Sequence, residues 1–198
     1  MPPLANLNAM PPVLSLRSKL VAVKDGVEGV LHPLRGGAAR RRLQRMAGPS
    51  VLFVCLGNVC RSPYGERVLK TRAGSGWNVL SAGFIGPDRA PPETALRVAR
   101  RRGVVHDDHR SRLVTPRMLA SADTVFFFDR HNRARLLAVP GVRPQRLFWL
   151  GDFDPEWDGK RAIPDPWGKA DGDFERVFAR IERCVDQVWD IVGARVTP

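Results

Sequence analysis

An apolar run that leads into a small-residue loop and then into a helix start constrains the fold of this chain more than any other feature. Residues 51–54 read Val-Leu-Phe-Val, and Pro63 follows after the loop. A short apolar run without alternation is typical of a strand buried on both faces of a parallel sheet. Proline is typical of the first turn of a helix. Because parallel strands need crossover connections, the chain is predicted to alternate strands with helices.

The same alternation is predicted through the rest of the chain. Further strands are expected at residues 78–81, 123–128 and 147–150. Helices are expected at residues 63–74, 92–102, 132–138 and 174–192. The length of 198 residues suits one domain with some additional chain. We therefore predict an α/β fold over residues 50–198, a three-layer sandwich in which helices flank a four-stranded parallel sheet.

The first quarter of the chain has a different composition. Residues 1–50 hold eight Lys and Arg residues against two acidic ones, and so carry half of the net charge of +12. From Leu16 onward apolar residues recur at helical spacing, although Gly26 and Gly29 interrupt the pattern. We predict that residues 1–49 form a basic extension, partly helical or disordered, whose charge favours contact with anionic surfaces.

Composition also excludes several classes of protein. No apolar run approaches the roughly 20 residues of a membrane span, and the N-terminus lacks a secretory pattern. Three cysteines cannot form a disulfide framework. A hydrophobic fraction of 43% argues against a disordered chain. We therefore expect a soluble cytoplasmic protein with anionic partners.

The loop after the first predicted strand has the composition of an anion-binding site. Cys55 and Arg61 bracket it, and Gly57 and Asn58 inside it are residues that tolerate positive φ. Such a loop can turn successive backbone N–H groups inward, and the helix that follows adds its positive end. Arg61 offers a planar fork for two phosphate oxygens, and the same donors would stabilise a thiolate at Cys55. We expect phosphate to be bound by Leu56, Gly57, Asn58, Val59, Cys60, Arg61 and Ser62.

Residues 54–63 read V-C-L-G-N-V-C-R-S-P. In this motif the chain resembles the low-molecular-weight protein tyrosine phosphatases, whose signature is V-C-x-G-N-x-C-R-S-P. The resemblance extends over about residues 50–193 and leaves residues 1–49 outside. It includes Ser81-Ala82-Gly83, the segment 109–112, Phe128-Asp129, Asp165-Pro166 and Asp173-Phe174-Glu175.

The resemblance implies a mechanism and assigns its residues. Cys55 would attack phosphorus and form a cysteinyl-phosphate, while Arg61 holds the equatorial oxygens. Asp165, on a separate Pro-rich loop, would be the general acid that protonates the leaving oxygen. Arginine and backbone donors supply the positive field, so neither a metal nor another cofactor is expected.

Further residues are implied to support this chemistry. Ser62 would donate its hydroxyl to the Cys55 thiolate, and Asn58 would lock the loop through hydrogen bonds to Ser81 and His109. Cys60 either traps an oxidised Cys55 as a reversible disulfide or is a packed thiol. Two other predictions are structural: Cys184 packs within the last helix, and Asp129 makes a structural contact at the end of the third strand.

The pocket walls indicate the substrate. Leu56, Val59 and Trp167 would form apolar walls that admit a phenyl phosphate and exclude the shorter phosphoserine. Family members often carry Trp or Tyr after the Ser-Ala-Gly element, and Phe84 is expected to take that place. We therefore predict a protein tyrosine phosphatase acting on a phosphotyrosine-containing protein. Bacterial members of the family suggest an autophosphorylating tyrosine kinase as that partner.

Other functions remain open at this stage. Protein arginine phosphatases of the same family usually carry threonine where Val59 stands, so Val59 favours tyrosine. Arsenate reductases of this fold need further cysteines, and none lies between Cys60 and Cys184. A small-molecule phosphatase is a further alternative. A non-catalytic anion-binding or nucleic-acid-binding module would fit the basic extension, but such a module needs neither a nucleophile nor an acid.

Overall fold

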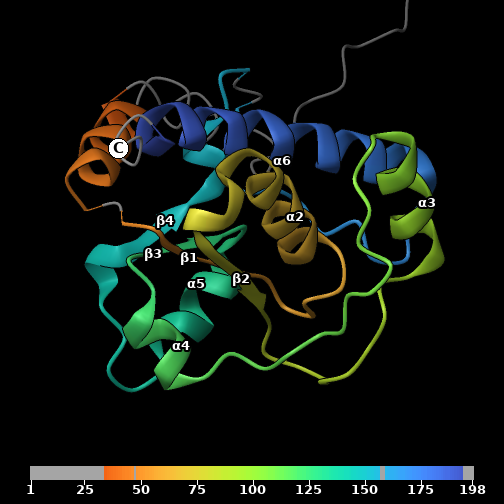
Figure 1. The fold of residues 1–198 in the computed structure, drawn as a ribbon, viewed down its shortest axis with the longest axis horizontal. Coiled ribbons are helices and arrows are strands. Elements are labelled where there is room, and N and C mark those ends of the chain that lie inside the picture. The colour runs from red at the N-terminus through yellow and green to blue at the C-terminus, as the bar shows by residue number, and fades with distance from the viewer. Residues whose placement is uncertain (1–33, 47, 157–158, 194–198) are drawn as a thin grey trace, which may run out of the picture.

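A computed structural model describes residues 34–46, 48–156 and 159–193. Its central layer is a four-stranded parallel sheet in the order β2-β1-β3-β4 (Figure 1). The strands are β1 (Ser50–Val54), β2 (Asn78–Ala82), β3 (Thr124–Phe127) and β4 (Leu147–Trp149). The prediction of a four-stranded parallel sheet is confirmed, and each strand lies within about two residues of its predicted bounds.

Helices cover both faces of the sheet (Figure 1). One face carries α2 (Arg61–Ala73), α3 (Glu93–Arg101) and α6 (Asp171–Val192). The other carries α4 (Pro116–Ser121) and α5 (Arg130–Leu137). Three short 3-10 turns are η1 (Gly74–Gly76), η2 (Pro144–Arg146) and η3 (Leu150–Phe153). The three-layer sandwich is therefore as predicted, apart from α4, which the sequence analysis did not include.

Successive side chains of β1 point to opposite faces of the sheet and so pack into two different cores. Phe53 packs into the larger core, with Phe178 and Ile181 of α6. Leu52 packs into the smaller core, with Leu136 of α5. A strand buried on both faces needs an unbroken apolar sequence, which explains the Val-Leu-Phe-Val run.

The sheet register brings the functional segments to one edge. Phe53 of β1 pairs with Ser81 of β2 and with Phe126 of β3. Because the strands are parallel, the chain leaves β1, β2 and β3 on the same side of the sheet. The loop that begins at Cys55, the Ser-Ala-Gly element and Asp129 therefore lie close together.

The extension takes part in the fold over part of its length. Residues 34–46 form a helix, in which Ala39 and Leu43 are buried in the larger core. Arg42 donates from Nη2 to the carbonyl oxygen of Leu147 in edge strand β4, at 2.6 Å. This side chain thus satisfies one backbone carbonyl group of the edge strand. The helical segment predicted from Leu16 lies outside the described residues. None of the helices described here is long and apolar enough to span a membrane.

Candidate active site

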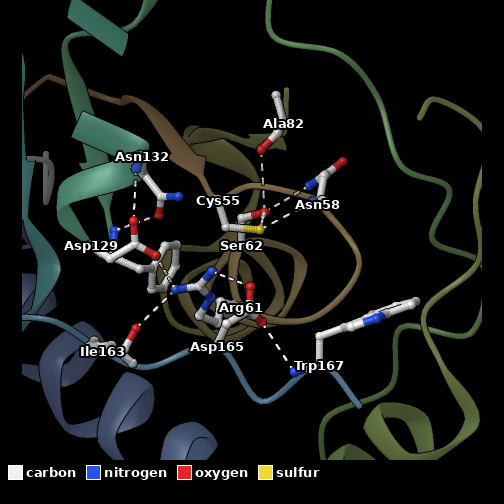
Figure 2. Close-up of polar contacts among 12 residues, drawn as sticks. Cys55, Asn58, Arg61, Ser62, Ala82, Asp129, Asn132, Ile163, Asp165 and Trp167 are labelled. Carbon is white, nitrogen blue, oxygen red and sulfur yellow. Dashed lines mark hydrogen bonds and ion pairs between the residues drawn. The ribbon is translucent and has the colours of Figure 1, made fainter. Parts of the chain in front are cut away.

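The sulfur of Cys55 lies beside Asn58 and Ser62 (Figure 2). Its Sγ accepts the backbone N–H of Asn58 at 3.2 Å and lies 3.0 Å from the hydroxyl oxygen of Ser62. Cys55 follows β1 directly, and α2 begins at Arg61, so the loop between them spans a strand-to-helix junction. The Cys55 sulfur is thus held by the backbone of its own loop and lies within hydrogen-bond distance of the first turn of α2.

Asn58 holds the loop in shape. Its φ of 51° lies in the left-handed region that Asn tolerates better than most residues. Its side-chain nitrogen donates to the hydroxyls of Ser62 at 2.9 Å and Ser81 at 2.8 Å, and its side-chain oxygen accepts the backbone N–H of Arg112. The Nε2 of His109 lies 2.8 Å from the Asn58 carbonyl oxygen. The structure therefore brings together the residues that the sequence expected to support the loop.

Gly83 lets the loop approach β2 closely. A Cβ at this position would lie 2.8 Å from the carbonyl oxygen of Leu56 and 2.9 Å from the backbone nitrogen of Asn58. Both contacts are shorter than carbon atoms tolerate, and both are to backbone that cannot turn away. The glycine of the Ser-Ala-Gly element is thus a steric requirement of the phosphate loop.

Arg61 is buried, and two of its three guanidinium nitrogens have hydrogen-bond partners. Its Nη1 donates to Asp129 at 2.7 Å and to the carbonyl oxygen of Ile163 at 3.0 Å. Its Nη2 donates to Asp165 at 2.5 Å, and its Nε has no hydrogen-bond partner in the described structure. Burial opposes the charge of Arg61, but Cys55, Asp165 and Asp129 hold its pKa above the ordinary value. Nε is therefore the donor that remains for a phosphate, and a phosphate that binds both Nε and Nη2 would share Nη2 with Asp165.

Asp165 reaches this arginine from a distant segment. Its Oδ2 meets Arg61, and its Oδ1 accepts the backbone N–H of Trp167 at 3.2 Å (Figure 2). The side chain is 40% exposed, so the carboxyl group lies at the mouth of the site. A carboxyl group there can exchange protons with solvent and with a bound ligand.

Asp129 contacts Arg61 in addition to making the structural contact that was predicted for it. The expected structural contact exists, because its Oδ1 accepts the Asn132 backbone N–H at the start of α5. Its Oδ2 also holds Arg61. The Arg61 contact was missed, because nothing in the sequence shows which carboxylate meets a buried arginine across the sheet.

A cavity of about 200 Å³ opens above the loop. Its lining residues are Cys55, Leu56, Gly57, Val59, Cys60, Ile85, Arg89, Asp165 and Trp167. Leu56, Val59 and Trp167 lie where the sequence analysis expected pocket walls. Phe84 does not line the cavity: it packs against the smaller core, under Arg135. Gly83 is bridged to Leu113, so the chain is extended there and successive side chains point to opposite sides.

Ile85 takes the place expected for Phe84, and Arg89 was also missed. Arg89 donates to the carbonyl oxygen of Gly57 at 2.7 Å, which ties the 85–89 segment to the loop. The alternation rule, extended past the Ser-Ala-Gly element, is the signal that points to Ile85. The sequence offers no comparable signal for Arg89.

Cys60, Cys184, His106 and His109 are buried. Cys60 lines the cavity, and burial raises the pKa of its thiol, so it is uncharged at neutral pH. The three cysteines, Cys55, Cys60 and Cys184, are free thiols. Burial also lowers the pKa of His109. Within the described ranges, no group of three or more His, Cys, Asp or Glu side chains is placed to hold a metal ion.

Comparison with known proteins places this geometry in a family. The family model described as low molecular weight phosphotyrosine protein phosphatase matches residues 50–197. The low molecular weight protein-tyrosine phosphatase A of Mycobacterium tuberculosis is 39% identical over 157 residues, covering 74% of this chain and 93% of the relative. The chain therefore belongs to the low-molecular-weight protein tyrosine phosphatase family, and it is a protein phosphatase.

Solved structures agree with this assignment. The tyrosine phosphatase AmsI of Erwinia amylovora has a TM-score of 0.68 and 26% identity, covering 74% of this chain and 94% of that one. Wzb of Vibrio vulnificus, in complex with benzylphosphonate, has a TM-score of 0.60 and 27% identity, covering 69% and 93%. The family match begins at residue 50, so it leaves out the helix at residues 34–46.

Proposed function

We propose that the protein hydrolyses phosphotyrosine in proteins through a cysteinyl-phosphate on Cys55. The observation that carries the proposal is the grouping of a thiol, an arginine and a carboxyl group at the phosphate loop. Cys55 and Asp165 line one cavity, and Asp165 accepts a hydrogen bond from Nη2 of the buried Arg61. A nucleophile, a fixed positive fork and an acid are the parts that phosphate monoester hydrolysis needs.

In the first step the Cys55 sulfur attacks phosphorus. The S–P bond forms as the bond from phosphorus to the tyrosine oxygen breaks, and Asp165 gives its proton to that oxygen. Arg61 and the backbone N–H groups of residues 56–62 bind the three equatorial oxygens, whose charge needs stabilisation in the transition state. Asp129 and the Ile163 carbonyl hold the other edge of Arg61 and so fix its fork.

In the second step water attacks the cysteinyl-phosphate. Asp165, now a carboxylate, takes one proton from the water as the S–P bond breaks. The products are inorganic phosphate and the Cys55 thiolate. Ser62, 3.0 Å from the sulfur, stabilises the departing thiolate by hydrogen bonding.

The cavity walls favour an aromatic leaving group. Val59, Ile85 and Trp167 present apolar surface around a cavity whose floor is Cys55. A relative's complex with benzylphosphonate, which joins a ring to a phosphate-like group, supports this choice. Val59 offers no hydroxyl to a phosphoarginine guanidinium. We take the substrate to be a phosphotyrosine-containing protein, with an autophosphorylating bacterial tyrosine kinase as the candidate partner.

The test compares phosphotyrosine and phosphoarginine peptides of one sequence, with wild-type protein, Cys55→Ser and Cys184→Ala. Cys184 is also a buried free thiol but lies on α6, so it is the matched control. We expect wild type and Cys184→Ala to hydrolyse phosphotyrosine, Cys55→Ser to be inactive, and rapid quenching to trap phosphocysteine. Turnover by Cys55→Ser would refute the covalent mechanism, and a preference for phosphoarginine would refute the tyrosine specificity alone.

A further inference from the structure

A second cavity, of about 610 Å³, lies beside edge strand β4. It is bounded by the helix at residues 34–46, by edge strand β4 and by α5. None of its lining residues is shared with the cavity above Cys55. The family model begins at residue 50, so one wall of this cleft lies outside the matched region. Catalysis therefore does not explain this cavity.

Arginine dominates the cleft. Its charged lining residues are Arg35, Arg42, Arg45, Arg133, Arg161 and Asp152. Asp152 pairs with Arg161 through two hydrogen bonds, of 2.7 and 2.6 Å, so these two charges neutralise each other. Four guanidinium groups remain without an acidic residue among the lining residues. Like charges that line one cavity repel one another, and an anion between them relieves the repulsion.

Three of these four arginines are free to turn toward a ligand. Within the part of the chain that the structure describes, the side chains of Arg35, Arg45 and Arg133 make no ion pair. Arg35 and Arg45 lie on the extension helix and Arg133 on α5, so they approach from two walls of the cleft. Guanidinium groups from opposing walls can bind separate oxygens of one anion.

Arg42 supplies a fixed positive charge beside them. Its guanidinium lies 4.0 Å from the centre of the Phe148 ring and donates to the Leu147 carbonyl oxygen. Burial lowers the pKa of Arg42. The charge of Asp152 partly offsets this, and the charge of Arg161 lowers the pKa further. The Arg42 charge is therefore not fully compensated within the described structure.

The aromatic residues of the cleft argue for phosphate over nucleobases. Trp149 is contacted by the Arg161 guanidinium, 4.7 Å from the ring centre, and by Phe127, whose ring centre lies 4.9 Å away. A nucleobase would need an open aromatic face on which to stack. The contacts that the cleft does offer are hydrogen-bond forks and positive charge, which suit phosphate oxygens.

We propose that this cleft binds an oligophosphate, a small anion with two or more linked phosphate groups. An oligophosphate carries several negative charges, which match four guanidinium groups better than the single negative charge of a carboxylate does. The volume also suits a small ligand, since small-molecule sites are usually about 300–1,000 Å³. The phosphate chain could be free or part of a nucleotide.

Calorimetry with the full-length protein tests the proposal. Tripolyphosphate is titrated into wild type, into Arg35→Gln/Arg133→Gln, and into Arg100→Gln/Arg117→Gln. The last pair removes the same charge from α3 and α4, outside the cleft. Because the catalytic loop also binds anions, its own affinity is measured separately, as competitive inhibition of 4-nitrophenyl phosphate hydrolysis. ATP is titrated in parallel to identify the source of the phosphate chain.

We expect two binding events in wild type and in the control. The event whose dissociation constant equals the inhibition constant belongs to the catalytic loop. In Arg35→Gln/Arg133→Gln the dissociation constant of the other event should rise at least tenfold, while the inhibition constant stays within twofold of wild type. Tighter binding of ATP would identify a nucleotide as the source, and equal binding would identify the phosphate chain alone. A single event in wild type that matches the inhibition constant would overturn the proposal. Equal weakening in both variants would also overturn it, because general charge would then explain the binding.

Discussion

The carboxylate of Asp129 joins the buried arginine of the active site to the start of a helix. One oxygen accepts a hydrogen bond from Arg61 Nη1 at 2.7 Å, and the other accepts the Asn132 backbone N–H at 2.8 Å. The arginine is thereby oriented by an element of the opposite helical layer. Its Nη1 is occupied and its Nη2 donates to Asp165, which leaves Nε as the donor without a partner in the described structure.

Replacing this carboxylate should weaken phosphate binding without unfolding the protein. In Asp129→Asn the amide oxygen can still cap α5, because Asn is as good an N-cap residue as Asp. The charged hydrogen bond to Arg61 is lost, which is worth about 1.5–3 kcal/mol. We expect kcat/KM to fall by roughly 10- to 100-fold.

The control for this prediction is Asp186→Asn. Asp186 also pairs with an arginine, Arg72, but on the exposed surface. Surface pairs of this kind contribute about 0–1 kcal/mol, so kcat/KM should be unchanged. A positioning role for Asp129 also requires that phosphate inhibits Asp129→Asn more weakly, by a similar factor. Unchanged inhibition by phosphate would count against it.

The acid role of Asp165 predicts a dependence on the leaving group. Asp165→Asn keeps the shape of the side chain but removes the proton that the leaving oxygen needs. General acid catalysis contributes about 10²–10⁴-fold, so hydrolysis of phenyl phosphate should slow by that order. 4-Nitrophenyl phosphate releases 4-nitrophenolate, which is a more stable anion, so its hydrolysis should slow much less. The comparison is made on kcat/KM, because the second step is the same for both substrates, and an equal fall in kcat/KM for both would contradict the role.

The fold and the phosphate loop were predictable because their signals are local. The strand, loop and helix start at residues 50–63 are contiguous, and buried parallel strands require apolar runs such as Val-Leu-Phe-Val. The contacts of Asn58 with Ser81 and His109 were expected only through the family resemblance. Nothing in the local sequence shows that these segments meet.

The features that were missed depend on tertiary contacts. Asp129 meets Arg61 only because β1 and β3 are neighbours in register. Phe84 was expected in the pocket because family members often carry Trp or Tyr after the Ser-Ala-Gly element. One step along an extended chain, however, turns Phe84 into the smaller core and Ile85 into the cavity. Composition alone does not determine which side of a strand end a residue faces.

The helix at residues 34–46 should contribute to stability as part of the core. Leu43 is 1% exposed, whereas Leu34 on the same helix is 69% exposed. Leu43→Ala removes buried methyl groups and leaves a cavity, which costs about 2–5 kcal/mol. Leu34→Ala should change the free energy of unfolding by no more than about 0.5 kcal/mol. Urea unfolding of both variants measures the difference, and equal effects would mean that the helix does not pack as described.

His106 should make the protein less stable as the solution becomes mildly acidic. Its side chain is fully buried, lies edge-on to Tyr64, and has no hydrogen-bond partner for either ring nitrogen in the described structure. Burial, aided by the charges of His109 and Arg67, lowers the pKa of His106 from 6.5 to about 4. Above pH 6.5 the ring is neutral in both the folded and the unfolded chain, so it adds no pH dependence.

Below pH 6.5 the unfolded chain binds a proton at His106 that the folded chain does not. Stability therefore falls with pH, by about 2 kcal/mol from this residue between pH 7 and pH 5. His106→Phe keeps an aromatic ring beside Tyr64 and should remove that part of the loss. His131 lies on the exposed surface of α5, so His131→Phe should leave the loss of stability between pH 7 and pH 5 unchanged. Because the pKa of His109 is also lowered by burial, the free energy of unfolding of His106→Phe should still fall with pH, but less steeply than that of wild type. Urea unfolding at pH 7 and pH 5 measures these slopes, and a slope in His106→Phe equal to that of wild type would show that His106 is not the titrating group.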